Sequence, residues 1–464
     1  METAMSVTFL GTSSGGGPSL SRNCSSLVAD VLGDGSLWMV DCAEGTLRQF
    51  SRQPYSPDRS QPRVSQISKM FITHMHADHV MGIIPLLRNV LYPPPAGEVA
   101  EQVLVDPSPK IEIFGPAGIR TFVRSILKMT LTKTRDNYVV HELLTEQDQI
   151  TPCDPPEVMH VNEVAGRDIV CSEDGFWRNI SRGKGRLSDV AVDAGPILHR
   201  GKFMRSIHLI HPCHGFVPDP CLGFVFRECF HPYRKVVVLG DTNDPSAIIP
   251  LCVNPSPSLL VHEATEAHIS QDIDPKSKRS FETVMGKAQG RGHSIPQMAG
   301  TFAKTIGAQK LVLNHIGGRF PAPGPNDRNP VRANVIAEIE RQASEAWGMG
   351  SARAAWDFMR VAIPVPTETV GDTQASTSQQ ASCESEFPTP SHTRTIPSKP
   401  SSTRRYYHTH TQSPGSSSHH NNSSSNNRNN FNANGQQHRY REGGGRRADR
   451  SERQDEYGSR KGRK

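Results

Sequence analysis

The chain has 464 residues and a formal net charge of +6 at pH 7. This charge is uneven, because residues 401–464 hold 13 Lys and Arg against 5 Asp and Glu, and the rest of the chain carries a net −2. The first residues lack the basic start and apolar run of a signal peptide, and no stretch approaches the roughly 18 apolar residues that cross a bilayer. The nine cysteines form no CxxC pair and are odd in number, which argues against a disulfide framework. We expect a cytoplasmic or nuclear protein, or one present in both compartments, with no membrane partner.

Up to about residue 366, short apolar runs alternate with amphipathic stretches. The pattern predicts strands over residues 6–12, 36–42, 69–74, 111–116, 138–143, 197–200, 222–226, 235–241, 258–264 and 310–316. It predicts helices over residues 78–91, 117–129, 295–307 and 334–347. Interleaved strands and helices indicate a layered α/β fold.

The composition changes after residue 366, where Ser, Thr, Asn, Gln, His and Arg dominate. The segment SSSHHNNSSSNNRNN, residues 416–430, is representative. Such a chain cannot bury enough apolar surface to offset the entropy lost on ordering. We therefore expect a folded domain over residues 1–366 and a disordered tail over residues 367–464.

Residues 71–80, FITHMHADHV, hold a dense group of potential metal ligands. In an extended segment alternate side chains share a face, so His74 and His76 can bind one ion. Asp78 and His79 follow where the chain turns into a helix, and they point towards a second ion. Imidazole and carboxylate groups suit zinc, and packing alone has no use for four such polar groups together. The cluster predicts a dinuclear metal centre.

Three further candidate ligands stand at the ends of apolar runs: His199 after AGPIL, Asp241 after VVVLG and His315 after LVLN. A buried strand is a rigid anchor for a ligand, and its end is where other strand ends converge. A single His or Asp at a strand end is more often structural, but the cluster at residues 74–79 strengthens the interpretation of all three as metal ligands. An aspartate such as Asp241 can bridge two ions.

With these motifs the chain resembles the metallo-β-lactamase superfamily, and within it the short form of the tRNA 3′-processing endoribonuclease RNase Z. The resemblance covers about residues 5–365. It rests on FLGTSSGGGPSLSRN (9–23), THMHADH (73–79), IEIFGPAGIRTFV (111–123), LGDT (239–242), HEAT (262–265), GHS (292–294) and LVLNHIGGRF (311–320). It implies an αββα sandwich of two mixed sheets with flanking helices.

The resemblance also implies a ligand set, a substrate and partners. One zinc would be held by His74, His76 and His199, a second by Asp78, His79 and His315, and Asp241 would bridge them, giving two zinc ions per subunit. The substrate would be precursor tRNA and the assembly a homodimer.

By the same likeness the enzyme would remove 3′ trailers from tRNA precursors and leave a 3′-hydroxyl. Asp78 would accept the proton of the attacking water, and His293 would protonate the leaving oxygen with support from His262 and Glu263. The loop that ends in Arg22 and Asn23 would lie beside the metal centre and meet the RNA 3′ end, with Arg22 as the phosphate contact. That loop lacks the Gly-Lys-Ser/Thr ending of a nucleotide-binding P-loop.

Three departures from the family pattern leave alternatives open. Leu20 stands where the family often has a lysine. Residues 201–216 intervene after His199, either as an insertion or as an error in the gene prediction, and they bring His214 forward as a rival ligand. Only about ten residues, 227–236, stand where many relatives carry a long tRNA-gripping arm.

Without an arm, the RNA would have to be held by the tail, by the partner subunit or by core residues such as Arg120, Arg124 and Lys128. The alternative activity is hydrolysis of a small phosphodiester or related ester by the same fold. A third hypothesis is a non-catalytic RNA-binding protein with a decayed site, which the intact ligand set argues against.

Overall fold

The computed structural model describes residues 5–56, 61–92, 108–200, 221–324 and 329–366. All of them fall within the first of the two units into which the chain divides, Met1–Glu386. The expected insertion at residues 201–216, with His214, and the expected disordered tail at residues 367–464 lie outside the described residues. Both stay predictions.

The first sheet has nine strands among the described residues, in the order β16-β1-β2-β3-β4-β5-β6-β7, with β8 beside β6. β16, β1, β2 and β3 pair antiparallel, whereas β3 to β8 pair parallel. The strands are β1 (Met5–Gly11), β2 (Ser26–Asp30), β3 (Leu37–Val40), β4 (Ile67–Phe71), β5 (Ile111–Pro116), β6 (Tyr138–Leu144), β7 (Glu163–Val164), β8 (Asp168–Val170) and β16 (Arg360–Ile363).

The second sheet has seven strands in the described part of the chain, in the order β15-β14-β13-β12-β11-β10-β9. β9 to β12 pair antiparallel and β12 to β15 pair parallel. The strands are β9 (Trp177–Gly183), β10 (Val190–Ile197), β11 (Cys221–Glu228), β12 (Lys235–Leu239), β13 (Leu259–Glu263), β14 (Leu311–Asn314) and β15 (Arg353–Ala354). β11 and β12 form a hairpin closed by residues 229–234, so no long arm lies between them.

The two sheets pack face to face, because alternate side chains of each strand point to opposite faces. Trp38 and Phe71 of the first sheet meet Phe224 and Phe226 of the second, with ring centroids 5.2 to 6.1 Å apart. These aromatic rings lie in one buried cluster with apolar side chains from both sheets. Strands such as β12 are apolar throughout, with Val236 and Val238 on this inner face and Val237 on the face that the helices cover.

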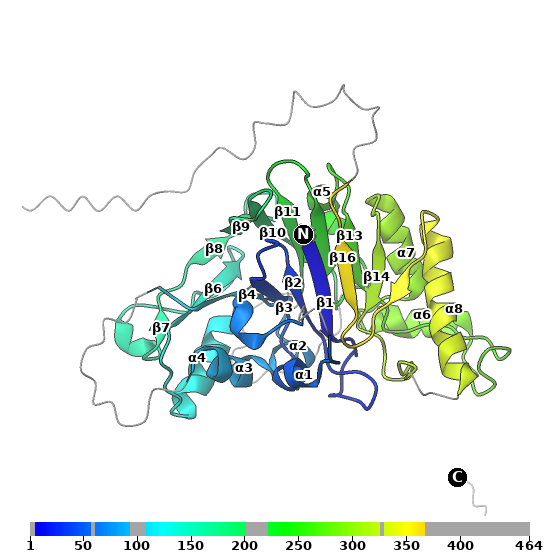
Figure 1. The fold of residues 1–464 in the computed structure, drawn as a ribbon, viewed down its shortest axis with the longest axis horizontal. Helices are drawn as coiled ribbons and strands as arrows, with labels where there is room; N and C mark the ends of the chain where they lie inside the picture. Colours follow the sequence, from blue (N-terminus) through cyan, green and yellow to red (C-terminus); the bar gives the residue numbers. More distant parts are fainter. Residues whose placement is uncertain (1–4, 57–60, 93–107, 201–220, 325–328, 367–464) are drawn as a thin grey trace, which may run out of the picture. The chain divides into compact units, whose positions relative to one another are not determined.

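Helices cover the outer face of each sheet (Figure 1). α3 (Ile83–Val90) and α4 (Ile119–Met129) pack on the first sheet, and α7 (Pro296–Thr305) and α8 (Pro330–Trp347) pack on the second. The remaining helices are α1 (Thr46–Arg52), α2 (Ala77–Val80), α5 (Ile249–Cys252) and α6 (Phe281–Gly290). The fold is the predicted αββα sandwich of two mixed sheets.

Two predicted boundaries are wrong. β10 ends at Ile197, so His199 lies in the loop after the strand and not within a strand over residues 197–200. The helix predicted over residues 78–91 breaks into α2 and α3 at Gly82. A Cβ at Gly82 would lie 1.9 Å from the carbonyl oxygen of Ala43. The backbone N–H of Gly82 donates to the Cys42 carbonyl at 2.8 Å. This close approach interrupts the helix.

Among the helices of the described residues, none is both long enough and apolar enough to cross a bilayer.

Candidate metal centre

The carboxyl ends of parallel strands from both sheets meet at one edge of the sandwich, as is general for open α/β sheets. Residues 74–79 follow β4, Asp241 follows β12 and His315 follows β14. His199 follows β10 and joins them through strand pairing. Ile197 at the end of β10 pairs with Cys221 of β11, and Gly223 of β11 pairs with Leu239 at the end of β12. The ends of β10 and β12 therefore lie close together. Ligands that are up to 241 positions apart in the sequence therefore lie together.

His74, His76, His199 and Asp241 form the first ligand group. His74 Nε2 lies 2.9 Å from His76 Nδ1 and 3.7 Å from Asp241 Oδ2, and His199 Nε2 lies 3.9 Å from the same oxygen. All four candidate ligand atoms lie within 4.8 Å of one another. The group has the spacing that a bound cation requires.

Asp78, His79 and His315 form the second ligand group. His315 Nε2 lies 3.3 Å from both Asp78 Oδ2 and His79 Nε2. The other oxygen of Asp241, Oδ1, lies 3.5 Å from His79 Nε2 and 3.2 Å from His315 Nδ1. The two oxygens of Asp241 thus face different groups, which is the geometry of a bridging carboxylate.

Neighbouring side chains orient these ligands. Asp41 accepts a hydrogen bond from His79 Nδ1 at 2.7 Å and a second from the backbone N–H of Thr73 at 2.8 Å. Thr265 Oγ1 lies 3.0 Å from His315 Nδ1. Such outer partners set the tautomer and direction of a metal-binding histidine. Sequence reasoning missed both residues, although Asp41 at the end of an apolar run gave the same signal as Asp241.

Strained backbone accompanies the ligands. Asp41 has a φ of 56° and His315 a φ of 52°, values that residues other than glycine rarely adopt. Gly292 has a φ of 81°, and its carbonyl accepts from His199 Nδ1 at 2.7 Å. A Cβ at Gly292 would lie 1.9 Å from the His199 carbonyl oxygen, so only glycine allows this approach. Backbone strain of this kind concentrates at functional sites.

The protonation states of the histidines fit a bound cation. Burial lowers the pKa of His199 to about 4, although Asp241 raises it, and it lowers the pKa of His74 well below the usual value. Both rings are therefore neutral at pH 7. The Nδ1 of His199 is occupied by Gly292, which leaves a lone pair on its buried Nε2, and Nε2 has no hydrogen-bond partner in the described part of the chain. A metal ion satisfies that atom.

His79 behaves differently from His74 and His199. Burial lowers its pKa, but the carboxylates of Asp241 and Asp41 hold it well above the usual value. Without a metal the ring keeps an extra proton between the two carboxylates. Because a ligating imidazole must be neutral, metal binding at this group displaces that proton.

His293 and Glu263 form a pair beside the ligand groups. His293 Nδ1 lies 3.0 Å from Glu263 Oε1 and 3.8 Å from Asp241 Oδ2. Burial lowers the pKa of His293, but the charge and hydrogen bond of Glu263 outweigh it and raise the value to about 9. Glu263 is held in turn by the N–H of Thr242 at 2.8 Å. The structure thus brings both residues to the centre.

The structure does not bring His262 to the centre. Successive side chains of β13 point to opposite faces, so His262 lies on the face away from Glu263. Its ring is fully buried, with its centroid 5.8 Å from that of Phe302 in α7. Its Nδ1 bonds to the Glu263 carbonyl at 2.8 Å. The expected support by His262 can therefore act only through the backbone.

The loop over residues 12–23 lies beside the centre, where the N–H of Gly15 donates to Asp78 Oδ2 at 2.6 Å. Arg22 and Asn23, however, are 2% and 3% exposed. The Arg22 guanidinium donates to the carbonyl of Ala355 at 2.6 Å and to Thr12 Oγ1 at 2.8 Å. Both residues hold the loop in place, and a phosphate contact by Arg22 would break these bonds.

The expected RNA contacts on α4 are contradicted for Arg120 and Arg124. Arg120 is fully buried, and its Nη1 lies 2.7 Å from Asp168 Oδ1. Arg124 donates two hydrogen bonds to Glu163, at 2.7 and 2.8 Å. Lys128 is exposed, and its Nζ donates to the carbonyl of Val158 at 3.1 Å. Both arginines tie α4 to the edge of the first sheet, because the amphipathic helix turns them inward.

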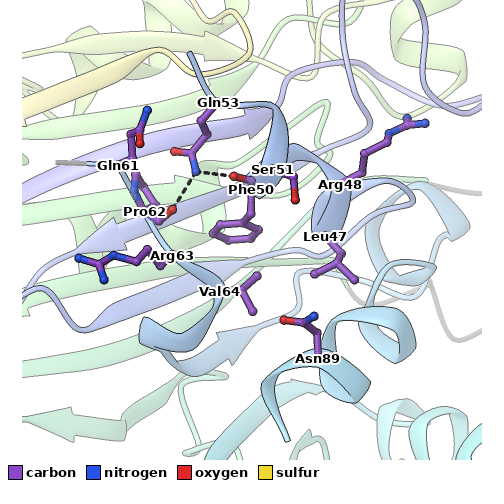
Figure 2. A pocket seen from close by; sticks show the side chains of 10 residues that line it. All are labelled: Leu47, Arg48, Phe50, Ser51, Gln53, Gln61, Pro62, Arg63, Val64 and Asn89. Carbon is purple, nitrogen blue, oxygen red and sulfur yellow. Dashed lines mark hydrogen bonds between the residues drawn. The ribbon is translucent and has the colours of Figure 1, made fainter. Parts of the chain in front are cut away.

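Cavities of similar size lie near the centre and away from it. One of about 680 Å³ reaches His199 and is lined by the acidic side chains of Glu146, Asp148 and Glu173. Another, of about 700 Å³, lies between α1, α3 and residues 61–64 (Figure 2). Among the described residues its lining has Arg48 and Arg63 as charged side chains and no histidine, cysteine or carboxylate.

A sandwich of two mixed sheets that gathers histidines and aspartates at its strand ends defines a metallohydrolase of the metallo-β-lactamase fold. No family model matches the chain. Curated proteins do: the human zinc phosphodiesterase ELAC protein 1 is 30% identical over 407 residues, covering 78% of this chain and 99% of the human protein. The ribonuclease Z of Streptococcus sanguinis SK36 is 30% identical over 345 residues, covering 73% and 96%.

A solved structure agrees. The crystal structure of the short form of human tRNase Z superposes with a TM-score of 0.50 at 29% identity, covering 78% of this chain and all of the human chain. The chain belongs to the ribonuclease Z family. The resemblance stated from the sequence is confirmed.

Proposed function

We propose that the protein is a zinc-dependent endoribonuclease that removes 3′ trailers from tRNA precursors and leaves a 3′-hydroxyl on the tRNA. The observation that carries this proposal is the His293–Glu263 pair beside a centre of seven ligands, in a chain whose relatives are named ribonuclease Z and zinc phosphodiesterase. An intact set of ligands argues against a decayed site.

Two zinc ions per chain fit the residues. His74, His76 and His199 would hold one, Asp78, His79 and His315 the other, and Asp241 would bridge through its two oxygens. When bound, such ions lower the pKa of a shared water towards about 7 and stabilise charge on the phosphoryl oxygens.

The residues around the ions provide the proton transfers. A pKa of about 9 keeps His293 doubly protonated at pH 7. Its Nδ1–H is taken by Glu263, so its Nε2–H is left to protonate the departing ribose 3′-oxygen. Asp78 keeps a pKa well below the usual range, because the hydrogen bond and charge of His315 outweigh its burial. It is therefore an ionised acceptor that can orient the attacking water.

The direct test is cleavage of a 3′-extended tRNA precursor by the purified full-length chain. We expect one cut after the discriminator base, loss of activity with a chelator and recovery with added zinc. A folded, zinc-loaded protein that leaves the precursor intact would refute the function.

The short hairpin between β11 and β12 favours a second candidate activity, hydrolysis of a small phosphodiester or related ester. A protein without the arm has one fewer contact for a large RNA. Comparing kcat/KM for the precursor with that for bis(p-nitrophenyl) phosphate separates the two activities.

A homodimer and a location in the cytoplasm, the nucleus or both remain part of the proposal. The family resemblance supports the dimer, and sedimentation equilibrium tests it. Six cysteines of the described residues are free thiols, which suits a reducing compartment: Cys24, Cys42, Cys153, Cys171, Cys221 and Cys252. Cell fractionation tests the location.

A further inference from the structure

Three arginines surround one buried carboxylate next to the metal centre. Glu266 has an 8% exposed side chain. Its Oε2 accepts from Arg279 Nη2 at 2.7 Å and from Arg319 Nη1 at 3.2 Å, and its Oε1 lies 3.9 Å from Arg291 Nη1. We call these four residues the arginine cluster.

The arginine cluster carries more positive charge than its own packing needs. A single bidentate arginine neutralises a carboxylate, as Arg124 does for Glu163. Here one negative charge meets three positive charges. Arg279 is mostly buried, but the side chains of Arg291 and Arg319 are 68% and 51% exposed. Two guanidinium groups therefore remain available to an anion from solvent.

Three members of the cluster, Glu266, Arg291 and Arg319, belong to segments that also build the centre. Glu266 follows Thr265, whose Oγ1 contacts His315 Nδ1 at 3.0 Å. Arg291 stands two residues before His293, a separation of at most about 7 Å along the chain. Arg319 stands four residues after His315. Backbone bonds join these segments: Glu266 N–H donates to the Ser294 carbonyl at 3.4 Å, and Gly317 N–H to the Thr265 carbonyl at 3.1 Å.

The Arg319 guanidinium is oriented before any ligand arrives, and Arg291 is anchored through its backbone. The Arg319 guanidinium lies over the Phe320 ring, 5.4 Å from its centroid, and it is also bonded to Glu266. Arg291 caps the carboxyl end of α6, where its backbone N–H donates to the Ala288 carbonyl at 3.1 Å. A guanidinium that is already oriented loses less entropy on binding a phosphate.

We propose that Arg291 and Arg319 bind a backbone phosphate of the RNA next to the scissile phosphate, on the His293 side of the centre, with Glu266 and Arg279 positioning them. The proposal rests on the proposed function, because it assumes an RNA substrate. The distribution of charge favours this path, since the cavity that reaches His199 is lined by the carboxylate side chains of Glu146, Asp148 and Glu173. The arginine cluster thus provides an RNA contact within the core. This contact is separate from any made by a long arm or by a basic tail.

The test uses the zinc-loaded full-length chain and the variants Arg291→Gln, Arg319→Gln and the double variant. RNA binding is measured as the inhibition constant of a single-stranded RNA oligonucleotide against bis(p-nitrophenyl) phosphate hydrolysis, at several salt concentrations. This reading needs no RNA cleavage. The matched control is Arg341→Gln on α8, which removes the same charge from a 53% exposed arginine that is paired with Glu338 and Glu345.

We expect each single variant to weaken RNA inhibition about tenfold, because a charge-assisted hydrogen bond to phosphate is lost. In the double variant the slope of the logarithm of affinity against the logarithm of salt should fall by roughly 0.7 to 1, since one fewer phosphate is neutralised. The loss in RNA binding should exceed any loss in turnover of the small diester by at least tenfold. Arg341→Gln should match the wild type in both.

Wild-type inhibition constants and salt slopes in the double variant would overturn the phosphate contact. Equal losses on RNA and on the small diester would also overturn it, because they indicate general damage to the centre. A wild type that fails to process precursor tRNA refutes the proposed function separately, since the inhibition measurement still reports on the cluster.

Discussion

The Asp241 carboxylate turns one oxygen to each ligand group, so the centre depends on this residue more than on any single histidine. Its pKa is held well below the usual range, because the charges of His315 and His79 outweigh its complete burial. It therefore stays ionised and available to cations across the physiological pH range.

We expect Asp241→Ala to lose metal and activity together, because both ligand groups lose a shared anion. The wild type should contain about two zinc ions per chain by elemental analysis, and the variant less than one. Well-folded wild-type protein that binds one ion or none would contradict the dinuclear centre.

His293→Ala should leave the zinc content unchanged, because all seven candidate ligands stay in place. Single-turnover cleavage of precursor tRNA should slow by roughly 10²–10⁴-fold, the range typical of a lost general acid. Wild-type single-turnover rates in this variant would remove His293 from the mechanism.

The pH dependence follows from the Glu263–His293 pair. A general acid must be protonated to act, so the rate should fall as pH rises through the pKa of His293. This pKa is about 9 without bound cations, and their positive charge places it at or below that value. In Glu263→Gln the charge that raises this pKa is gone and burial still lowers it, so the descending limb should move towards acidic pH. A limb at the same pH in both proteins would show that another group controls it.

At the scale of elements, α4 shows that arginines on an amphipathic helix do not always form an exposed basic surface. Its arginines resemble a basic face, yet Arg120 bonds to Asp168 and to the carbonyls of Val140, Thr151 and Arg167. These bonds join α4 to β6 and β8 and satisfy backbone groups at the sheet edge. The helix therefore stabilises the fold and leaves RNA binding to other residues.

We expect Arg120→Met to lower the free energy of unfolding by about 3–5 kcal/mol, because the fully buried Glu142 carboxylate, 3.6 Å from Arg120 Nη1, is left uncompensated. Chemical denaturation measures this change. RNA affinity per folded molecule should stay at the wild-type value. Reduced affinity with unchanged stability would restore Arg120 as an RNA contact.

At the scale of the whole molecule, charge is separated along the chain. Residues 401–464 carry a net +8 and the rest a net −2. A polyanion is thus attracted to the C-terminal residues and, within the described part of the chain, to local groups such as the arginine cluster.

Truncation after residue 366 should weaken tRNA binding and flatten its salt dependence, because fewer counterions are released when fewer cations meet the RNA. Hydrolysis of bis(p-nitrophenyl) phosphate should persist, since the ligands all lie before residue 366. Unchanged tRNA affinity and salt slope after truncation would assign RNA capture to the core alone.

The sequence by itself indicated a layered α/β fold and the candidate ligands, and the resemblance to a known family added the αββα arrangement and the division of these ligands between two ions. Apolar runs show where strands lie, and a strand end that carries His or Asp shows where ligands gather. In residues 74–79 the chemistry is contiguous, so no knowledge of long-range contacts is needed. The likeness at residues 262–265 and 292–294 added His293 and Glu263, which the structure brings together at 3.0 Å.

Only the tertiary structure decided which charged groups face solvent. Arg22 and Arg120 carry the same charge as Arg291 and Arg319, and nothing in their local sequence separates the two pairs. The partners that bury Arg22 include Phe320 and Ala355, about three hundred residues away in the chain. The arginine cluster likewise joins three separate segments around Glu266. Burial and pairing depend on contacts that form when distant segments pack, so a pattern of neighbouring residues cannot encode them.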